Sequence, residues 1–290
     1  MRLDRIELAE TLEPGVLYIV ATPIGNLQDI SLRALLVLEG VDLVAAEDTR
    51  HTGILLKAYG LKKNLMSCFA HNEEKQSRRI IAFLQEGGTV ALVSDAGMPG
   101  ISDPGSRLVR QAVKAGVKLT VIPGPSAGVA ALAASGLDTA AFAFGGFIPR
   151  DAKGRKAWFK RFGGFTGTLI IYESPRRLQE TLLMLKEAWG DRYCCIAREL
   201  TKRYEEFIRG SLTEAAGKVA EAGGLKGEVV IVLEGCPEPD GKSFSPEEAE
   251  EWGKALLAEG MGKKEASRRL AEKTGLSAKA SYAMLLEWDR

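Results

Sequence analysis

The chain has 290 residues, of which 46% are hydrophobic and 27% are charged, and its formal net charge is +1. This length predicts about two domains. No apolar run reaches the ~20 residues that a bilayer span requires, and the N-terminal sequence MRLDRIELAE lacks the apolar core of an export signal. The sequence has only two histidines, which excludes a histidine-rich metal site, and its four cysteines lack ligand spacing. They are expected to be reduced thiols in a cytoplasmic protein.

The small net charge hides a basic middle segment. Residues 150–209 contain 14 Lys and Arg against 8 Asp and Glu, a net charge of +6, so the rest of the chain carries −5. A basic segment of this kind favours a polyanionic partner at one face of the protein. An ordinary solvated surface explains the composition equally well.

The first half of the chain alternates apolar strands with helical segments. Strands are expected at residues 16–21, 41–47, 65–69, 90–94 and 118–122. Helices are expected at residues 32–39, 73–85 and 105–115, with a further helix that ends near Tyr59. This alternation predicts a mainly parallel sheet with helices on both faces.

The second half repeats the alternation with one difference. Strands are expected at residues 141–147, 168–172, 192–197, 205–209 and 228–233. Helices are expected at residues 126–136, 157–162, 175–189 and 213–222. The turn near residues 199–201 is too short for a crossover helix, so its two strands should be antiparallel and the sheet mixed.

The predicted fold class is therefore α/β, with three parts. An N-terminal α/β domain covers residues 1–122, and a second α/β domain covers residues 123–236 and begins with a Pro-Gly-Pro hinge. After a polar linker, residues 244–290 form a small helical module.

Residues 90–105, with the sequence VALVSDAGMPGISDPG, are the most informative stretch. A buried strand there ends in Ser-Asp and a loop rich in glycine and proline, at the sheet edge where open parallel sheets bind ligands. Ser102 or Asp103 is expected to cap the following helix. A plain strand-to-helix connection is the alternative, but such loops are commonly ~2–6 residues long.

Polar residues also follow other strands, at 22–26, 47–50, 173–175 and 198–201. Charged groups near a sheet edge need partners or solvent, so their convergence on one cleft is expected. The sequence contains neither a G-x-x-x-x-G-K-[ST] nor a G-x-G-x-x-G motif, and two histidines leave no Ser-His-Asp set. The residues alone indicate an α/β protein with a ligand cleft between two domains.

Six segments, taken in order, resemble one known family. They are ATPIGNLQDIS (21–31), AAEDTRHTGILL (45–56), VSDAGMPGISDPG (93–105), IPGPSAGVAAL (122–132), IIYESPRR (170–177) and REL (198–200). They resemble the tetrapyrrole methylase superfamily and, more closely, its branch of ribosomal RNA small-subunit methyltransferases. Two positions depart from that branch: Met98 stands where Thr is usual, and Arg176 where His is usual.

The resemblance implies a cofactor, a substrate and an assembly. The methyl donor would be S-adenosylmethionine, bound in the cleft between the two α/β domains, and no metal is expected. The acceptor would be the ribose 2′-hydroxyl of a cytidine in the decoding region of small-subunit ribosomal RNA, acted on alone or in the assembled subunit by a homodimer. The residues expected to bind the cofactor are Asp95, Gly97, Met98, Ile101, Ser126, Ala127, Tyr172 and Glu228.

A methyl transfer to a hydroxyl also needs a proton acceptor. The candidates at strand ends are Asp48, Glu173 and Glu199, and Lys202 joins them if burial lowers its pKa. Their alternative role is a structural set of ion pairs with neighbouring arginines. The residues expected to contact RNA are Arg50, Lys153, Arg155, Lys156, Arg176, Arg177 and Arg198, with Ala157, Trp158 and Phe162 anchoring the helix of the basic segment.

The C-terminal module has the helix, short glycine turn, helix pattern of a helix-turn-helix, with Ser277 as an expected N-cap. Residues 244–290 contain 8 basic and 9 acidic residues, so net charge does not favour nucleic acid over a docking or dimer-bracing role. Two other functions remain open from the sequence. One is a methylase of a small tetrapyrrole-like substrate, and the other is a ribosome assembly factor that binds RNA without catalysis.

Overall fold

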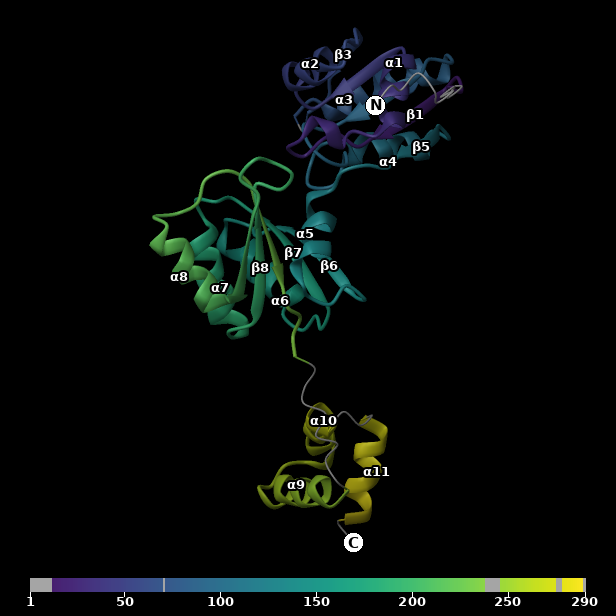
Figure 1. Cartoon of the computed structure of the whole chain (residues 1–290). Helices are drawn as coiled ribbons and strands as arrows, with labels where there is room; N and C mark the ends of the chain where they lie inside the picture. Colours follow the sequence, from purple (N-terminus) through teal and green to yellow (C-terminus); the bar gives the residue numbers. More distant parts are fainter. Residues whose placement is uncertain (1–11, 70, 238–245, 275–277, 289–290) are drawn as a thin grey trace. The chain divides into compact units, whose positions relative to one another are not determined.

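The computed structural model describes residues 12–69, 71–237, 246–274 and 278–288. The chain divides into two compact units, Met1–Cys236 and Pro237–Arg290, and each is described by itself. Both sheets lie in the first unit, and Figure 1 labels its helices and several of its strands. The division of this unit at residue 122 stays a prediction. None of the described helices is long and apolar enough to cross a membrane.

The first sheet contains five parallel strands in the order β3-β2-β4-β1-β5, which confirms the predicted parallel sheet. The strands are β1 (Val16–Val20), β2 (Leu43–Ala46), β3 (Asn64–Ser67), β4 (Val90–Val93) and β5 (Lys118–Ile122). Four helices connect them: α1 (Leu32–Gly40), α2 (Thr49–Ala58), α3 (Glu73–Gln85) and α4 (Ser106–Lys114). A short 3-10 helix, η2 (Leu27–Asp29), precedes α1.

Helices cover both faces of this sheet, because its central strands are apolar on both sides. Tyr18 of β1 belongs to a buried cluster with α1 and α2, whereas its neighbour Leu17 belongs to a cluster with α3 and α4. Successive side chains of a strand point to opposite faces. The continuous apolar sequence of β1 therefore contributes side chains to two buried clusters, one on each face of the sheet.

The strand order places a crevice between β1 and β4. The chain leaves β1 through α1 towards β2, and it leaves β4 through α4 towards β5 on the other side of β1. The loops after β1 and β4 therefore diverge, which is where open α/β sheets bind ligands. The two loops are joined at their base, where Thr22 and Gly97 exchange backbone hydrogen bonds of 2.9 and 3.0 Å.

The second sheet has the order β6-β7-β10-β8-β9 and is mixed. Its strands are β6 (Phe142–Phe147), β7 (Thr168–Glu173), β8 (Tyr193–Arg198), β9 (Glu206–Ser211) and β10 (Val229–Leu233). Only β6 and β7 pair in parallel, and the other pairs are antiparallel. The antiparallel pair β8–β9, joined by the short turn, is confirmed.

One face of the second sheet packs against α5 (Ala127–Ser135) and the other against α6 (Ala152–Phe162), α7 (Leu178–Trp189) and α8 (Leu212–Glu221). The helix predicted at residues 157–162 begins at Ala152 instead, because the Asp151 side chain accepts a hydrogen bond of 2.7 Å from Gly154 N and caps it. Trp158 anchors this helix by donating to Gly145 O at 2.8 Å, but Ala157 is exposed rather than an anchor.

The described part of the second unit contains three helices, which agrees with the predicted helical module. They are α9 (Pro246–Ala258), α10 (Lys263–Thr274) and α11 (Ala278–Trp288). Leu256, Leu270 and Leu285 are buried together in its core, along with Ala249 and Ala266. A turn is predicted at residues 274–276, but Thr274 is the last residue of α10. The rest of that turn and the Ser277 cap lie outside the described residues.

The helix after the 90–105 loop is capped by a distant residue, which corrects one prediction. Neither Ser102 nor Asp103 caps α4; the N-cap is Gly105, which has no side chain. Oε1 of the buried Glu73, at the start of α3, accepts hydrogen bonds from Gly105 N, Arg107 N and Leu108 N at 3.0, 2.8 and 3.2 Å. A buried carboxylate can satisfy several free N–H groups of a first turn, so a local cap is not needed.

Glu73→Ala should therefore destabilise the first unit by about 2–4 kcal/mol, because it leaves buried N–H donors without an acceptor. The change is measured as a lower urea midpoint. Glu74→Ala is the matched control, since Glu74 is exposed and pairs with Arg78 at the surface. Equal midpoints for the two variants would contradict the capping role.

Candidate active site

A cavity of about 350 Å³ is lined by the loops that follow β1 and β4 and by residues of the second sheet. This volume is typical of a site for a small organic ligand. One wall consists of Ile24, Ala96, Gly97, Met98, Ile101, Ser102 and Asp103, together with Ser126 and Ala127 at the start of α5. The other consists of Phe147, Tyr172, Glu173, Ser174, Pro175, Ala197, Leu200, Gly227, Glu228, Val229 and Val230.

The β4 loop follows a path that only a few residues tolerate. Gly97, Gly100 and Gly105 have φ of +79°, +81° and +121°, and Ser102 has φ of +67°. Glycine adopts these values without the Cβ clash that other residues meet. The loop therefore turns repeatedly within a short distance and brings its backbone to the cavity wall.

Tyr172 of β7 connects the second sheet to the start of α5. Its hydroxyl oxygen accepts a hydrogen bond of 3.1 Å from Gly128 N, and its ring meets Phe144 and Phe147 edge-on with centroids 4.8 and 5.8 Å away. Burial raises the pKa of Tyr172 above its ordinary value. The phenol is therefore neutral at physiological pH and provides an aromatic wall with one polar end.

The structure brings together most of the residues predicted to bind a cofactor. Gly97, Met98, Ile101, Ser126, Ala127, Tyr172 and Glu228 all line the cavity. Asp95 is not part of the lining. Its Oδ1 accepts a hydrogen bond of 3.1 Å from Asp48 N and joins the end of β4 to the start of α2. Contact of any of these residues with a cofactor stays a prediction.

Glu173 lines the cavity, but its side chain is buried and its oxygens already have donors. Oε2 accepts a hydrogen bond of 2.7 Å from Thr181, Oε1 accepts one of 2.7 Å from Ser174 N, and Arg177 Nη2 lies 3.6 Å from Oε2. A buried carboxylate whose oxygens all accept hydrogen bonds stabilises the segments that donate them. Glu173 fixes the junction of β7 and α7 at the cavity wall.

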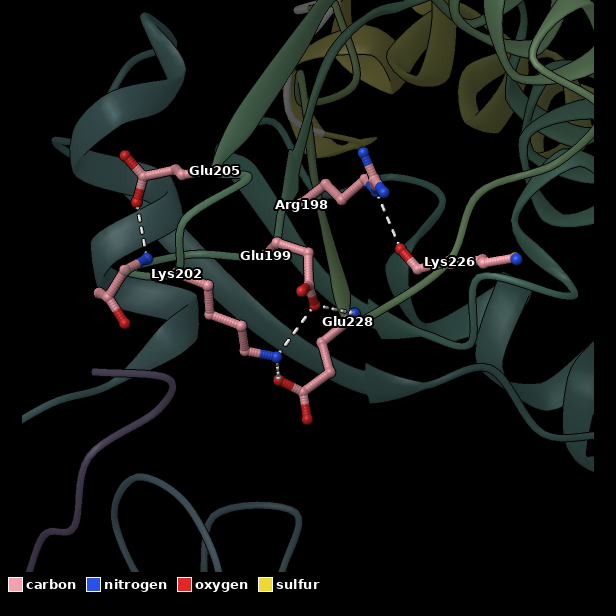
Figure 2. Close-up of polar contacts among 7 residues, drawn as sticks. Arg198, Glu199, Lys202, Glu205, Lys226 and Glu228 are labelled. Atoms are coloured by element: carbon pink, nitrogen blue, oxygen red, sulfur yellow. Dashed lines mark hydrogen bonds and ion pairs between the residues drawn. The ribbon is translucent and has the colours of Figure 1, made fainter. Parts of the chain in front are cut away.

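Glu199 and Lys202 form a charged cluster with Glu228 at the turn between β8 and β9, shown in Figure 2. Lys202 Nζ lies 2.9 Å from Glu199 Oε1 and 2.9 Å from Glu228 Oε2. Glu199 Oε1 also accepts a hydrogen bond of 3.0 Å from Glu228 N. This cluster links the turn to the start of β10, whose residues line the cavity.

The charges of this cluster are mutually stabilised. Burial alone would lower the pKa of Lys202, but hydrogen bonds with Glu228 and Glu199 outweigh it and raise the pKa above its ordinary value. The hydrogen bond from Lys202 in turn lowers the pKa of Glu199. The condition under which Lys202 could accept a proton, a pKa lowered by burial, is therefore not met. The amine stays protonated between two carboxylates.

The same turn is strained and tightly packed. Glu199 and Thr201 have φ of +51° and +64°, although neither is glycine. Gly25, in the loop after β1, lies so close that a Cβ atom there would be 2.7 Å from Leu200 O and 2.6 Å from Lys202 Cγ. Strained conformations persist only where surrounding contacts hold them. Glu199 and Lys202 are therefore well placed to position the cavity wall at Leu200.

Asp48 lies outside the cavity lining. It is the N-cap of α2, and Arg50 Nη2 lies 2.6 Å from its Oδ2. Hydrogen bonds from Arg50 hold the pKa of Asp48 well below its usual range. An acid this strong is a weak proton acceptor near neutral pH.

The residues predicted to contact RNA fall into two groups. Arg50, Lys153, Lys156 and Arg176 are exposed. The others are partly buried and have protein partners: Arg155 donates to Met184 Sδ at 3.7 Å, Arg177 to Ile148 O at 3.2 Å, and Arg198 to Lys226 O at 2.8 Å. Within the first group, Arg50 also pairs with the Asp48 carboxylate, although its side chain stays exposed.

Asp103 is a cavity residue that the sequence did not single out for a site. It lines the wall, is half-buried, and its carboxylate forms no hydrogen bond or ion pair with another described residue. Burial, with added repulsion from Glu47 and Asp95, raises its pKa to about 6. The sequence near Asp103 does not show whether this residue caps α4 or lines the cavity. The answer depends on Glu73, which caps α4 and is far away in the chain.

The described residues form no candidate metal site. No group of three or more His, Cys, Asp or Glu among them could hold a metal ion.

Solved structures with low sequence identity share this fold. Diphthine synthase matches with a TM-score of 0.59 and 18% identity, covering 76% of this chain and 90% of that protein. Uroporphyrin-III C-methyltransferase from Thermus thermophilus, in complex with S-adenyl homocysteine, matches with a TM-score of 0.53 and 17% identity, covering 75% of this chain and 96% of that protein. At these identities the likeness concerns the fold alone.

Sequence relatives are much closer. Residues 16–216 match the family of Tetrapyrrole (Corrin/Porphyrin) Methylases. The ribosomal RNA small subunit methyltransferase I of Halalkalibacterium halodurans is 44% identical over 93% of this chain and 94% of its own length. The protein of the same name from Synechocystis is 43% identical over 95% of this chain and 99% of its own length. The chain therefore belongs to the tetrapyrrole methylases and, among them, to the ribosomal RNA small subunit methyltransferase I family.

Proposed function

We propose that this protein transfers a methyl group from S-adenosylmethionine to the ribose 2′-hydroxyl of a cytidine in the decoding region of small-subunit ribosomal RNA. The observation that carries the proposal is the identity of 44% to a ribosomal RNA small subunit methyltransferase I over nearly the full length of both chains. The alternative of a small tetrapyrrole-like substrate has weaker support, because the methylases of that class matched by fold are only 17–23% identical.

The cavity fits the cofactor in size and in chemistry. Its volume of about 350 Å³ suits a small molecule, and its lining combines apolar side chains, an aromatic wall at Phe147 and Tyr172, and the glycine-rich β4 loop. Asp103 and Glu228 add carboxylates. A cationic sulfonium beside carboxylates, with an adenine against aromatic rings, is a favourable arrangement. The residues that would hold the cofactor are those of the β4 loop, the start of α5, Tyr172 and the start of β10.

The donor supplies an electrophilic methyl group, and the protein mainly has to align the acceptor hydroxyl with it. Holding two reactants in line converts a bimolecular step into an effectively unimolecular one. Segments from both sheets line the cavity in which the reactants would be aligned. Gly25 packs closely against the β8–β9 turn, and the Glu199–Lys202–Glu228 cluster holds that turn to the start of β10.

RNA binding is proposed for the basic segment at the start of α6. Lys153 and Lys156 are exposed there, and Arg155 is half-exposed. Arg50 and Arg176 offer further exposed charge. Contacts between basic side chains and phosphates release counterions, so this binding should be strongly dependent on salt.

Replacing Lys153, Arg155 and Lys156 together with Ala should weaken RNA binding and flatten its salt dependence by about two to three phosphate contacts. Affinity for S-adenosylmethionine should be unchanged. An RNA-binding titration across salt concentrations measures this, with Lys218→Ala on α8 as a control that removes a positive charge elsewhere. A wild-type slope in the triple variant would exclude this segment from the RNA contact.

We further infer that the protein is a homodimer that acts in the cytoplasm. The edge strand β6 exposes Phe142 and Phe144, with 48% and 37% of each residue accessible. Exposed aromatic side chains clustered on an edge strand are typical of a protein interface. The location in the cytoplasm is inferred from the proposed substrate, which is the RNA of the small ribosomal subunit.

The proposal is tested by methyl transfer in vitro. Small subunits from cells that lack the protein are incubated with purified protein and S-adenosylmethionine labelled in its methyl group. We expect label in the RNA at a ribose 2′-oxygen. RNA binding without any transfer of label would favour the non-catalytic assembly factor instead.

A further inference from the structure

The turn between β8 and β9 carries an aromatic side chain that is open to solvent. Tyr204 has 67% of its surface accessible, a larger fraction than any other aromatic residue that the structure describes. Leu200, in the same turn, is buried and lines the cavity. Tyr204 is therefore exposed on a segment that also forms part of the cavity wall.

Arg203 places a positive charge over the ring of Tyr204. Its guanidinium carbon lies 5.5 Å from the ring centroid, which is a cation–π contact. Arginine side chains also cover other rings among the described residues, but those rings are partly buried: Phe162, Trp189 and Phe207. Tyr204 differs from them because it combines a neighbouring cation with an open surface. This combination suits single-stranded nucleic acid, which presents flat bases next to phosphates.

The turn below Tyr204 is held by its own hydrogen bonds. Thr201 N donates to Glu205 Oε2 at 2.7 Å, as Figure 2 shows, and Glu205 N donates to Lys202 O at 3.2 Å. The acidic neighbour Glu205 is thereby engaged by the backbone of the turn. An aromatic ring on a fixed support loses little conformational freedom when it binds a partner. The turn therefore presents the Tyr204 ring in a defined place.

We propose that Tyr204 stacks on a base of the RNA next to the acceptor nucleotide. This inference rests on the proposed function. The acceptor ribose has to enter a cavity with walls from both sheets, so its nucleotide must leave the stack of its neighbours. The adjacent base then loses a stacking partner. An exposed aromatic ring on the turn that lines the cavity replaces that partner.

This contact differs in kind from the one proposed for the basic segment of α6. That segment offers exposed charge, but the aromatic residues of α6 are buried or partly buried. Lysine and arginine contacts to phosphates depend strongly on salt, whereas stacking on a ring releases no counterion. The two regions can therefore be separated by the salt dependence of binding.

The experiment uses small ribosomal subunits from cells that lack the protein, and it measures both their affinity for the protein and methyl transfer to them. Tyr204→Ala should weaken binding by about 5- to 100-fold, which is the scale of base stacking on an aromatic ring. The KM for the subunits should rise by a similar factor with little change in kcat, because the contact is present before and during the reaction. The slope of affinity against salt should stay that of the wild type.

Conservative variants and a matched tyrosine serve as controls. Tyr204→Phe should keep near wild-type affinity, because it retains the flat ring and removes only the hydroxyl. Tyr193→Ala should also keep it, since Tyr193 is an exposed tyrosine at the start of β8, at the other end of that strand from the turn. The dissociation constant for S-adenosylmethionine, measured by calorimetry, should be unchanged in all three variants.

Three results would overturn the inference. Wild-type affinity and KM in Tyr204→Ala would do so and would leave the proposed function standing. A loss of affinity shared by Tyr204→Phe would assign the contact to the hydroxyl and not to the ring. A changed oligomeric state of Tyr204→Ala in light scattering would assign Tyr204 to a protein contact. A wild type that binds the subunits without transferring a methyl group would instead contradict the proposed function, and the affinities would still decide the stacking contact.

Discussion

Ala127→Trp should abolish S-adenosylmethionine binding, with a loss in affinity of about 100-fold or more, and should stop methyl transfer. Ala127 begins α5 and lines a cavity of only about 350 Å³, so an indole there occupies the space that the cofactor needs. The core of the protein should tolerate the change, because Ala127 is only partly buried. Binding is measured by isothermal titration calorimetry.

Ala133→Trp is the matched control for this experiment. Ala133 is on the same helix but is exposed, and it does not line the cavity. Ala133→Trp should keep wild-type affinity for S-adenosylmethionine. A loss of affinity in Ala127→Trp alone would then result from a blocked cavity and not from a damaged helix. Unchanged affinity in Ala127→Trp would show that the cofactor site lies elsewhere.

Gly25→Ala should lower both cofactor affinity and the rate of methyl transfer by about tenfold or more. The added Cβ would lie 2.7 Å from Leu200 O, and a backbone oxygen cannot move aside cheaply. The loop after β1 must therefore shift from the β8–β9 turn. Ile24 and Leu200, which line the cavity from these two segments, would then separate.

Gly217→Ala provides the comparison, because Gly217 is an exposed position of α8 with nothing within 4 Å of an added Cβ. Alanine is favoured over glycine in a helix, so this variant should be as stable as the wild type or slightly more stable. If both glycine variants keep wild-type affinity and rate, contact between the two loops does not define the site.

Most of the fold follows from patterns that are local in the sequence. The bounds of β5 (Lys118–Ile122) and α3 (Glu73–Gln85) agree with the prediction, because each is a continuous pattern bounded by turn residues. The start of α6 was predicted too late, since its first turn is polar and basic and lacks an apolar face. Its N-cap, Asp151, is the signal that places the start correctly.

The candidate site could be predicted only in part, because its chemistry depends on contacts between distant segments. Strand ends and glycines indicated the β4 loop, and Gly97 and Met98 do line the cavity. Which carboxylate has a free oxygen could not be predicted. That outcome depends on Glu73 capping α4, which leaves Asp103 free, and on Lys202 bridging Glu199 and Glu228 across the turn.

The central claim, that this protein methylates a cytidine ribose of small-subunit ribosomal RNA, is tested most directly by mass spectrometry of that RNA. The RNA is taken from cells with the protein, from cells without it, and from cells that carry Ala127→Trp. One decoding-region cytidine should carry a ribose 2′-O-methyl group only in the first sample. Identical modification in all three samples would contradict the claim.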